Sequence, residues 1–309
     1  MAPNPARLVV SVSDANMAAA LRDIEGVDVV VWDMSAPSPV PAIDLLVPPF
    51  LTGSDWTKQL STAKIRLVQS PMLGYDGMAE RLPAGVAFAN AASVHETSTS
   101  ELALALILAM QRGIPDFVRA AERGEWKRGW RQSLADRRVL LVGCGGVGKA
   151  IAQRLVPFEV VLTRVAQHQR SDEFGDIYGI ESLPDLLPNA EVVIIAVPLN
   201  DSTTHLVDDA FLSQMSDGAM LVNIARGQVA DTDALLDHAR SGRLRFALDV
   251  TDPEPLPEGH PLFALENVLI SPHVGGATSA AIPRLIRLVK QQIERLRDAE
   301  EPLNVVIRT

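Results

Sequence analysis

A glycine-rich turn between a predicted strand and a predicted helix constrains the fold of this chain more than any other feature. The turn spans residues 143–148, with the apolar run 138–142 before it and the helix-like stretch 149–155 after it. Glycines at this spacing permit a tight turn, a close approach of the backbone to a pyrophosphate, and close packing of helix on strand. We therefore expect a dinucleotide site, with the pyrophosphate held by N–H groups at the helix start. The residues assigned to it are Gly143, Gly145, Gly146, Val147 and Gly148.

The glycine turn opens a series of apolar runs that alternate with helical patterns. The runs lie at 138–142, 160–163, 192–197, 219–224, 245–250 and 267–270. This alternation predicts a doubly wound parallel sheet of the Rossmann type. The N-terminal third has the same character, with strands expected at 7–13, 27–32, 43–47 and 65–69 and a helix at 16–23. The fold class is therefore α/β, with two parallel-sheet domains.

Two longer helices and one irregular stretch complete the pattern. A helix is expected at 93–112, and its segment 101–110 is apolar all round, which predicts burial between layers. An amphipathic helix is expected at 280–297. The charged stretch 122–138 contains Trp126 and Trp130, which we interpret as packing residues rather than cofactor contacts.

Charge and cysteine content exclude several classes of function. The 309 residues carry 28 basic and 38 acidic side chains, a net charge of −10, which disfavours binding to nucleic acid or a membrane surface. A few arginines close together can still bind a small anionic ligand. The single cysteine, Cys144, excludes an internal disulfide and a cysteine-built zinc site, and no metal site is predicted. No signal peptide or membrane span is visible, so a cytoplasmic location is the default expectation.

The residue that meets the adenosine ribose is expected about 20 residues after the start of the glycine motif. That position is Thr163, at the end of the predicted strand 160–163, and Arg164 follows it. A carboxylate there would bind two ribose hydroxyls and repel a 2′-phosphate, whereas Thr and Arg favour the phosphate. The sequence therefore favours NADP(H), with NAD(H) as the second option. The alternative is that Arg164 is a solvated loop residue.

Three further segments each follow a predicted strand, at the edge where open α/β sheets bind ligands. They are 223–227, 249–255 and 271–276. They bring Arg226, Glu254 and His273 toward the region expected for the nicotinamide.

These segments resemble the D-isomer-specific 2-hydroxyacid dehydrogenase family. The resemblance covers nearly the whole chain and includes Gly74-x-Asp76, Glu101, the glycine motif, Pro198-Leu199, the segment 223–227, Asp249-Val250, Glu254-Pro255, His260-Pro261-Leu262 and Pro272-His273. It implies a discontinuous, flavodoxin-like substrate-binding domain, residues 1–98 and 277–309. The Rossmann dinucleotide-binding domain would comprise residues 99–276.

The resemblance also implies roles for individual residues. Arg226 would hold the substrate carboxylate and its 2-oxygen, because a planar guanidinium suits paired oxygen acceptors. His273 would give a proton to the carbonyl as hydride leaves the nicotinamide, and Glu254 would fix the imidazole tautomer. Backbone N–H groups of Met72, Leu73 and Gly74 would bind the substrate carboxylate. Asp249 would contact the nicotinamide amide, and Pro198, Ala225 and Gly275 would line the cofactor site.

Departures from other branches of the family narrow the substrate. Glu254 stands where the formate-oxidising branch has Gln, and Leu73 where the phosphite-oxidising branch has Lys. A reductase of small 2-oxo acids remains, acting on glyoxylate, hydroxypyruvate or a larger apolar 2-oxo acid. Phe50, Met72 and Leu73 could line an apolar side-chain pocket or simply pack the wall.

Alternatives remain open at this point. The chain could be a dinucleotide-sensing, corepressor-like binding module without physiological turnover, a role that relatives with the same Arg, Glu and His set perform. The resemblance implies a homodimer. The long apolar helix expected at 93–112 and the segment 113–131 could form its contact, although the sequence does not separate this from burial within one chain. His95 and His260 are interpreted as structural residues.

Overall fold

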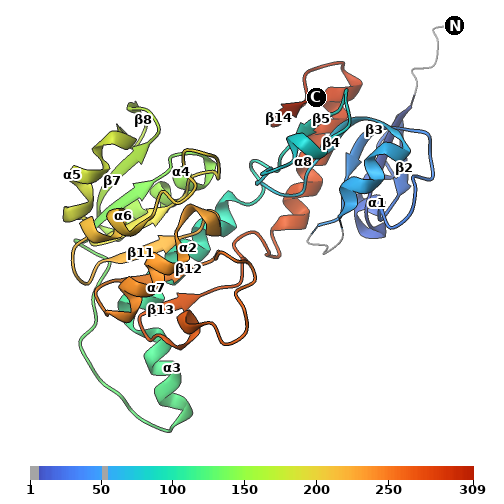
Figure 1. Cartoon of the computed structure of the whole chain (residues 1–309). Coiled ribbons are helices and arrows are strands. Elements are labelled where there is room, and N and C mark those ends of the chain that lie inside the picture. The colour runs from blue at the N-terminus through green and yellow to red at the C-terminus, as the bar shows by residue number, and fades with distance from the viewer. Residues whose placement is uncertain (1–6, 51–54) are drawn as a thin grey trace, which may run out of the picture. The chain divides into compact units, whose positions relative to one another are not determined.

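The computed structural model describes residues 7–50 and 55–309, and the chain divides into two compact units (Figure 1). Unit 1 combines residues 1–95 with 279–309, and unit 2 comprises residues 96–278. The chain therefore enters unit 2 at the start of one helix and returns to unit 1 just before another.

Unit 1 is built on a six-stranded sheet in the order β14-β5-β4-β3-β1-β2. The strands are β1 (Leu8–Val12), β2 (Val27–Val31), β3 (Ala42–Val47), β4 (Lys64–Gln69), β5 (Ala87–Ala89) and β14 (Val305–Arg308). Neighbouring strands among β1 to β5 are parallel, and their order 2-1-3-4-5 is that of flavodoxin-like sheets. The C-terminal strand β14 adds an antiparallel edge on β5. The flavodoxin-like prediction is therefore confirmed.

Two helices help to form the core of unit 1. Helix α1 (Ala15–Leu21) begins at Asp14, whose side chain accepts hydrogen bonds from the N–H groups of Asn16 and Met17. Such a cap contributes about 1 kcal/mol. Helix α8 (Ala281–Arg297) is the amphipathic helix expected at 280–297, and its apolar side chains pack with those of β1 and α1 in one buried cluster. Short 3₁₀ turns lie at Trp56–Thr62 and Ala79–Arg81.

Unit 2 is built on an eight-stranded sheet in the order β13-β12-β11-β10-β6-β7-β9-β8. The strands are β6 (Arg138–Val142), β7 (Val161–Ala166), β8 (Arg170–Asp172), β9 (Gly175–Gly179), β10 (Val192–Ile195), β11 (Met220–Asn223), β12 (Arg245–Leu248) and β13 (Val268–Ile270). The paired strands are parallel except β8, which runs antiparallel to β9. The order around β6 is that of a Rossmann sheet, which confirms the predicted fold class.

The helices of unit 2 are α2 (Glu96–Arg112), α3 (Ile114–Glu122), α4 (Gly146–Leu155), α5 (Leu183–Leu186), α6 (Asp209–Gln214) and α7 (Thr232–Arg240). Short 3₁₀ turns lie at Val156–Phe158, Ile180–Ser182, Leu187–Asn189, Gly227–Val229 and Pro261–Ala264. The middle of α2 packs with α4 and with the inward faces of β6, β10 and β11 in one buried cluster, as its apolar sequence predicts.

Two sequence expectations differ from the structure. Strand β7 ends at Ala166 rather than at Thr163, because the apolar pair Val165 and Ala166 continues the buried strand and Val165 pairs with Val142 of β6. Trp126 and Trp130 do not pack within the chain: their side chains are 86% and 100% exposed. The segment between α3 and β6 has no helix or strand and runs as a long loop between these two elements (Figure 1).

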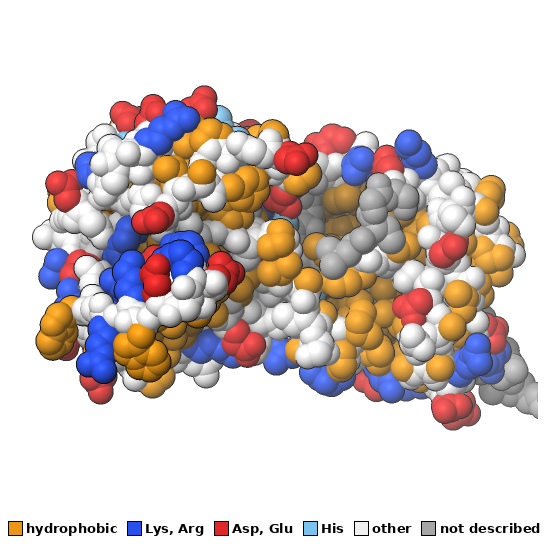
Figure 2. Space-filling model, turned by 90° about the horizontal axis from the view of Figure 1, so that it is seen from below, with side chains coloured by type: hydrophobic (Ala, Val, Ile, Leu, Met, Phe, Trp, Pro, Cys, Tyr) orange, Lys and Arg blue, Asp and Glu red, His pale blue; other side chains and the backbone are white. Residues whose placement is uncertain are grey.

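The charged side chains and the helix lengths of the described residues bear on the expectations from the sequence. On the face seen in Figure 2, Lys and Arg side chains are interspersed with Asp and Glu. Within residues 7–50 and 55–309, no helix is both long and apolar enough to cross a membrane.

Candidate functional site

The glycine turn joins β6 to α4, and the reason why glycine is required differs from one position of the turn to the next. Gly143 has φ 106°, and a Cβ there would overlap the carbonyl of Ala196. A Cβ on Gly148 would overlap the carbonyl oxygen of Gly143, so this glycine permits the close packing of helix on turn. Gly145 has an ordinary φ, and a Cβ there would meet nothing within 4 Å. The open space at Gly145 therefore suits a ligand that approaches the backbone.

The same turn presents the start of a helix to solvent. Gly145 and Gly146 are exposed, and α4 begins at Gly146. The turn is held from behind, since Gly143 N–H donates to the carbonyl of Val165 at 2.8 Å. The first N–H groups of a helix have no acceptor within the helix, so this end of α4 can hold an anion such as a pyrophosphate. These residues fit the expected dinucleotide.

The two residues assigned to the ribose end lie elsewhere than expected. Thr163 pairs with Leu140 within the sheet and does not reach the carboxyl end of β7. Arg164 is 3% exposed, and its guanidinium lies 2.7 Å from the carboxylate of Asp172 and 2.8 Å from the carbonyl oxygen of Gly175. The guanidinium also stacks on the Phe174 ring at 5.6 Å. Arg164 is therefore neither a solvated loop residue nor exposed to an anion; it holds the β8–β9 hairpin.

The residues that follow the end of β7 are not among those that the sequence assigns to the cofactor site. Residues 167–170 are exposed and include His168 and Arg170. The Arg170 guanidinium donates to the carbonyl oxygen of Cys144 at 3.3 Å, which places it beside the glycine turn. The signal that could have found them is the apolar pair Val165-Ala166, which lengthens the strand by three residues.

Arg226, Glu254 and His273 come from three adjacent strands of the sheet. Strands β11, β12 and β13 end at Asn223, Leu248 and Ile270, and the three functional segments follow directly. His273 Nδ1 lies 2.5 Å from Oε1 of Glu254, so the imidazole donates its Nδ1 proton to a carboxylate. Both side chains are only partly buried, at 36% and 42% exposed. Among the described residues, no hydrogen bond is made by Nε2 of His273, so it is the ring nitrogen that can exchange a proton with a substrate.

Asp249 organises the loop that carries His273. Its carboxylate accepts hydrogen bonds from the Ser271 hydroxyl at 2.7 Å, from Val274 N–H at 2.9 Å and from Gly275 N–H at 3.0 Å. Its carbonyl accepts from His273 N–H at 2.7 Å. His273 itself has φ 53°, a left-handed conformation that a non-glycine residue adopts at a cost. The buried Asp249 therefore holds His273 in a conformation that it would not adopt alone.

The segment around Arg226 is fixed by its own hydrogen bonds. The Asn223 side chain accepts from Ala225 N–H and donates to the carbonyl of Arg226, both at 3.0 Å. The Arg226 guanidinium donates to the Ala225 carbonyl at 2.7 Å. A Cβ on Gly227 would overlap the backbone of Thr251, so this glycine lets the Arg226 segment lie against the segment that leads to Glu254.

The other residues assigned to the cofactor lie at the same edge of the sheet. Pro198 is exposed beyond the end of β10. Its carbonyl accepts from the Thr203 hydroxyl at 2.7 Å. Ala225 is 6% exposed, and Gly275 is buried against Asp249. Their contacts with a cofactor stay predictions.

The loop assigned to the substrate carboxylate lies in unit 1, after β4. Met72, Leu73 and Gly74 are half-buried, as is Phe50. Phe50 stacks on His95 with ring centroids 5.8 Å apart, an arrangement that accounts for this ring as wall packing. His95 is 4% exposed and bonds the Pro71 carbonyl. His260 accepts from Leu262 N–H at the start of a 3₁₀ turn, so both histidines have structural contacts.

The chain is similar to known proteins over most of its length. A family model described as "D-isomer specific 2-hydroxyacid dehydrogenase, NAD binding domain" matches residues 104–275. The glyoxylate reductase of Pyrococcus furiosus is 31% identical over 304 residues, which cover 91% of this chain and 90% of that protein. The human glyoxylate reductase/hydroxypyruvate reductase is 33% identical over 227 residues, 70% of this chain and 69% of that protein.

The chain is also similar to a solved structure over almost its whole length. It is a D-isomer specific 2-hydroxyacid dehydrogenase from Xanthobacter autotrophicus Py2 in complex with NADPH and MES. It is 28% identical to this chain, aligns with a TM-score of 0.82, and covers 98% of each chain.

Proposed function

The chain belongs to the D-isomer specific 2-hydroxyacid dehydrogenase family, and we propose that it is a reductase of small 2-oxo acids such as glyoxylate and hydroxypyruvate. The observation that carries this proposal is the His273–Glu254 pair, which follows neighbouring strands of a Rossmann sheet. The similarity to glyoxylate reductases over most of the chain supports the same reaction. None of these observations favours the alternative of a binding module without turnover.

His273 moves the proton of the reaction. When bound, the nicotinamide supplies or accepts the hydride, and the protein supplies placement and charge. Nδ1 of His273 is hydrogen-bonded to Glu254. The other ring nitrogen, Nε2, therefore gives a proton to the carbonyl oxygen of the substrate during reduction and takes it back during oxidation. Glu254 fixes the tautomer and stabilises the imidazolium that precedes the transfer.

Arg226 binds the substrate through its guanidinium. Its planar N–H donors match the carboxylate and the adjacent 2-oxygen of a 2-oxo acid. In reduction, charge develops on the 2-oxygen, and a fixed cation beside it stabilises the transition state. The bonds from Asn223 that shape the Arg226 segment keep this cation in place.

For the cofactor we infer a preference for NADP(H). No carboxylate occupies residues 163–170, and the acids that follow are paired: Asp172 with Arg164, and Glu173 with Lys149 at 2.7 Å. Because Arg164 is buried, the exposed Arg170 is the cation we assign to a 2′-phosphate. The NADPH bound by the relative from Xanthobacter autotrophicus is consistent with this assignment.

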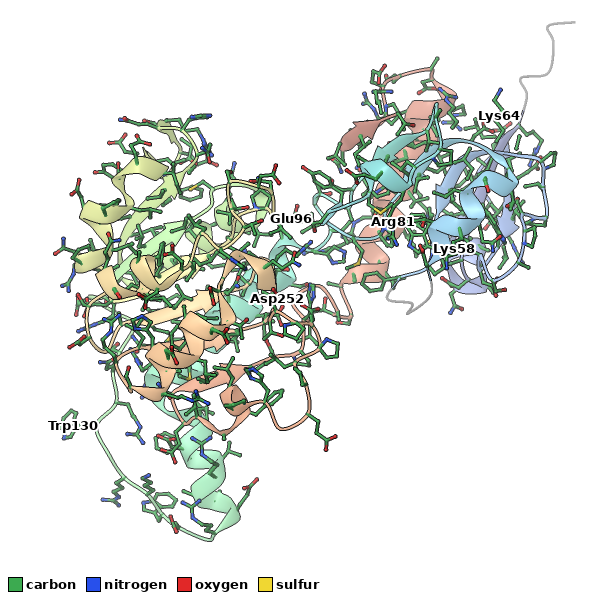
Figure 3. All side chains as sticks on the ribbon, in the orientation of Figure 1. Lys58, Lys64, Arg81, Glu96, Trp130 and Asp252 are labelled. Carbon is green, nitrogen blue, oxygen red and sulfur yellow. The ribbon has the colours of Figure 1, made fainter. Side chains whose placement is uncertain are left out.

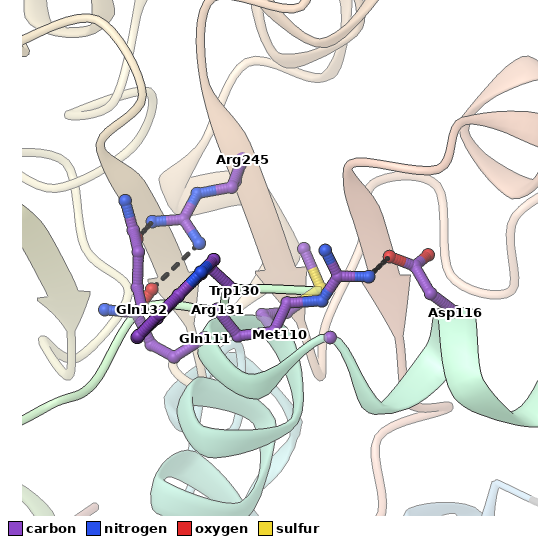
Figure 4. A pocket seen from close by; sticks show the side chains of 8 residues that line it. Met110, Gln111, Asp116, Trp130, Arg131, Gln132 and Arg245 are labelled. Carbon is purple, nitrogen blue, oxygen red and sulfur yellow. Dashed lines mark hydrogen bonds and ion pairs between the residues drawn. The ribbon is translucent and has the colours of Figure 1, made fainter. Parts of the chain in front are cut away.

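We also propose that the chain forms a homodimer through α3 and the segment after it. Ile114 and Val118 of α3 are 47% and 54% exposed, and Trp130 is fully exposed, pointing away from the ribbon in Figure 3. The segment is nevertheless tied at its end (Figure 4), where Arg131 bonds Asp116 and Gln132 accepts from Arg245. Anchored apolar side chains without cover are typical of an association surface.

The test of the function is a rate comparison over a panel of 2-oxo acids with NADPH and NADH. We expect the nicotinamide absorbance to fall with glyoxylate or hydroxypyruvate. The variant His273→Asn should lose turnover by a factor of about 10² to 10⁴ while it binds the cofactor as the unmodified protein does. Turnover that survives His273→Asn would overturn the assignment.

A further inference from the structure

The loop 70–74 of unit 1 has every carbonyl oxygen from residue 70 to residue 73 hydrogen-bonded by the protein. The donors to these carbonyls are Gln69 Nε2 to Ser70 (2.9 Å), His95 Nε2 to Pro71 (2.7 Å), Ala91 N–H to Met72 (2.9 Å) and Asn90 Nδ2 to Leu73 (2.9 Å). Four successive carbonyls held in this way leave the loop little freedom to rotate its peptide planes.

Holding the carbonyls also aims the N–H groups. In a trans peptide the C=O and the following N–H point in opposite directions. The bond to the Met72 carbonyl therefore orients Leu73 N–H, and the bond to the Leu73 carbonyl orients Gly74 N–H. Among the described residues, neither N–H group has a hydrogen-bond partner. Two adjacent N–H donors, each aimed opposite to a held carbonyl, suit the two oxygens of a carboxylate.

The donor to the Leu73 carbonyl is the side chain of Asn90, the residue that follows the end of β5. Asn90 is itself held on three sides: its Oδ1 accepts from Ala92 N–H at 3.2 Å, its N–H donates to the Asn304 carbonyl at 3.1 Å, and its carbonyl accepts from Gln69 at 2.9 Å. Its side chain is therefore fixed in the orientation that meets Leu73.

A fully buried pair of amide side chains, Gln69 and Gln292, fixes the end of β4, from which the loop 70–74 starts. Gln69 and Gln292 are both 0% exposed, and Gln292 Nε2 donates to Gln69 Oε1 at 2.8 Å. Gln292 also donates to the carbonyl and accepts from the N–H of Leu303. Burying an amide side chain costs free energy unless its polar atoms are hydrogen-bonded, and apolar side chains at these two positions would avoid that cost. Their satisfied bonds instead fix the end of β4, where the loop begins.

We propose that Asn90 is a positioning residue, which aims Gly74 N–H at the substrate carboxylate by holding the carbonyl of Leu73. The inference rests on the proposed function, because the anion is the carboxylate of the 2-oxo acid. Asn90 contacts no reacting atom. Its loss should weaken the binding of the acid and leave the binding of the cofactor unchanged.

The experiment compares Asn90 with a matched asparagine in the same unit. Asn304 Nδ2 donates to the Ala92 carbonyl at 3.0 Å, which is a bond of the same kind outside the loop. We would make Asn90→Ala and Asn90→Asp, with Asn304→Ala and Asn304→Asp as controls. The Ala variants remove the donor without adding charge, and the Asp variants keep the shape.

For both Asn90 variants we expect the KM of glyoxylate and the Kd of oxamate to rise about tenfold, with the Kd of NADPH unchanged. In the free protein, amide hydrogen exchange at residues 72–75 should also quicken. The Asn304 variants should lose similar thermal stability with little change in the KM of glyoxylate.

Three results would count against the proposal. Equal KM changes in the Asn90 and Asn304 variants would reduce Asn90 to a structural residue. An unchanged KM in a folded Asn90→Ala protein would overturn the inference and leave the proposed function intact. Failure of the unmodified protein to turn over any 2-oxo acid would overturn the proposed function, and this inference with it.

Discussion

His273 Nδ1 lies 2.5 Å from Glu254 Oε1, although 19 positions of sequence separate the two residues. The bond is charge-assisted when the imidazole is protonated, and a neutral amide cannot supply that charge. Glu254→Gln should therefore lower kcat for glyoxylate reduction by about tenfold or more, with the Kd of NADPH unchanged. Steady-state rates with saturating NADPH measure the effect.

A nearby acid provides the control for this prediction. Glu258 is exposed on the same segment, and Glu258→Gln should turn over at the rate of the unmodified protein. If Glu254→Gln kept full kcat, the orienting role of Glu254 would have to be abandoned.

Arg226 should not tolerate the apparently conservative change to Lys. An ammonium is a point charge and cannot donate to two oxygens in one plane as a guanidinium does. We expect Arg226→Lys to lower kcat/KM for glyoxylate by about 10- to 100-fold. The exposed Arg240 of α7 is the control, since Arg240→Lys should leave kcat/KM unchanged. Equal catalytic efficiency in Arg226→Lys and the unmodified protein would contradict the role given to Arg226.

The sequence predicted the sheets well because their signals are local. Each buried parallel strand is a short apolar run, and the glycine turn at 143–148 has steric causes that the structure reproduces at Gly143 and Gly148. Arg226, Glu254 and His273 follow adjacent strands as expected, since the order of strands in a doubly wound sheet follows from its connections.

Side-chain partnerships at a distance could not be predicted. The position of Arg164 in the sequence predicts a contact with the cofactor, yet Arg164 pairs with Asp172 in a hairpin whose short strands have no distinct apolar pattern. A count of residues from the glycine turn also misplaced the end of β7, because the strand continues through Val165 and Ala166. Trp126 and Trp130 are apolar, but composition does not say whether another part of the same chain covers them.

Substitutions of Arg164 and Arg170, the two arginines near the glycine turn, should have different effects, one on protein stability and the other on the KM of NADPH. Arg170→Ala should raise the KM of NADPH about tenfold and leave the KM of NADH unchanged, because a charged contact to the 2′-phosphate is lost. Arg164→Ala should lower the melting temperature, because it removes the ion pair with Asp172 and the bond to the Gly175 carbonyl that hold the hairpin. The reverse pattern, with Arg164→Ala specific for NADPH, would return the phosphate contact to Arg164.

Cys144 should be a slow thiol despite its position in the glycine turn. Burial raises the pKa of the Cys144 thiol, and the nearby Arg164 and Arg170 only partly oppose this. A raised pKa leaves less thiolate at pH 7, so alkylation should be slow there and should accelerate as the pH rises above 9. Intact-mass measurement of iodoacetamide labelling between pH 7 and 10 tests this. Labelling at pH 7 as fast as that of a free cysteine would contradict it.

Association through α3 should be sensitive to charge on its exposed apolar side chains. Val118 is 54% exposed, and Val118→Asp together with Trp130→Asp would place unpaired carboxylates at the proposed contact, where desolvation is costly. We expect light scattering to give a dimer mass for the unmodified protein and a monomer mass for the double variant at micromolar concentration. Val156→Asp, at a 62% exposed position of the same unit, should stay dimeric. A monomeric unmodified protein, or a double variant that remains a dimer, would show that this surface is not the contact.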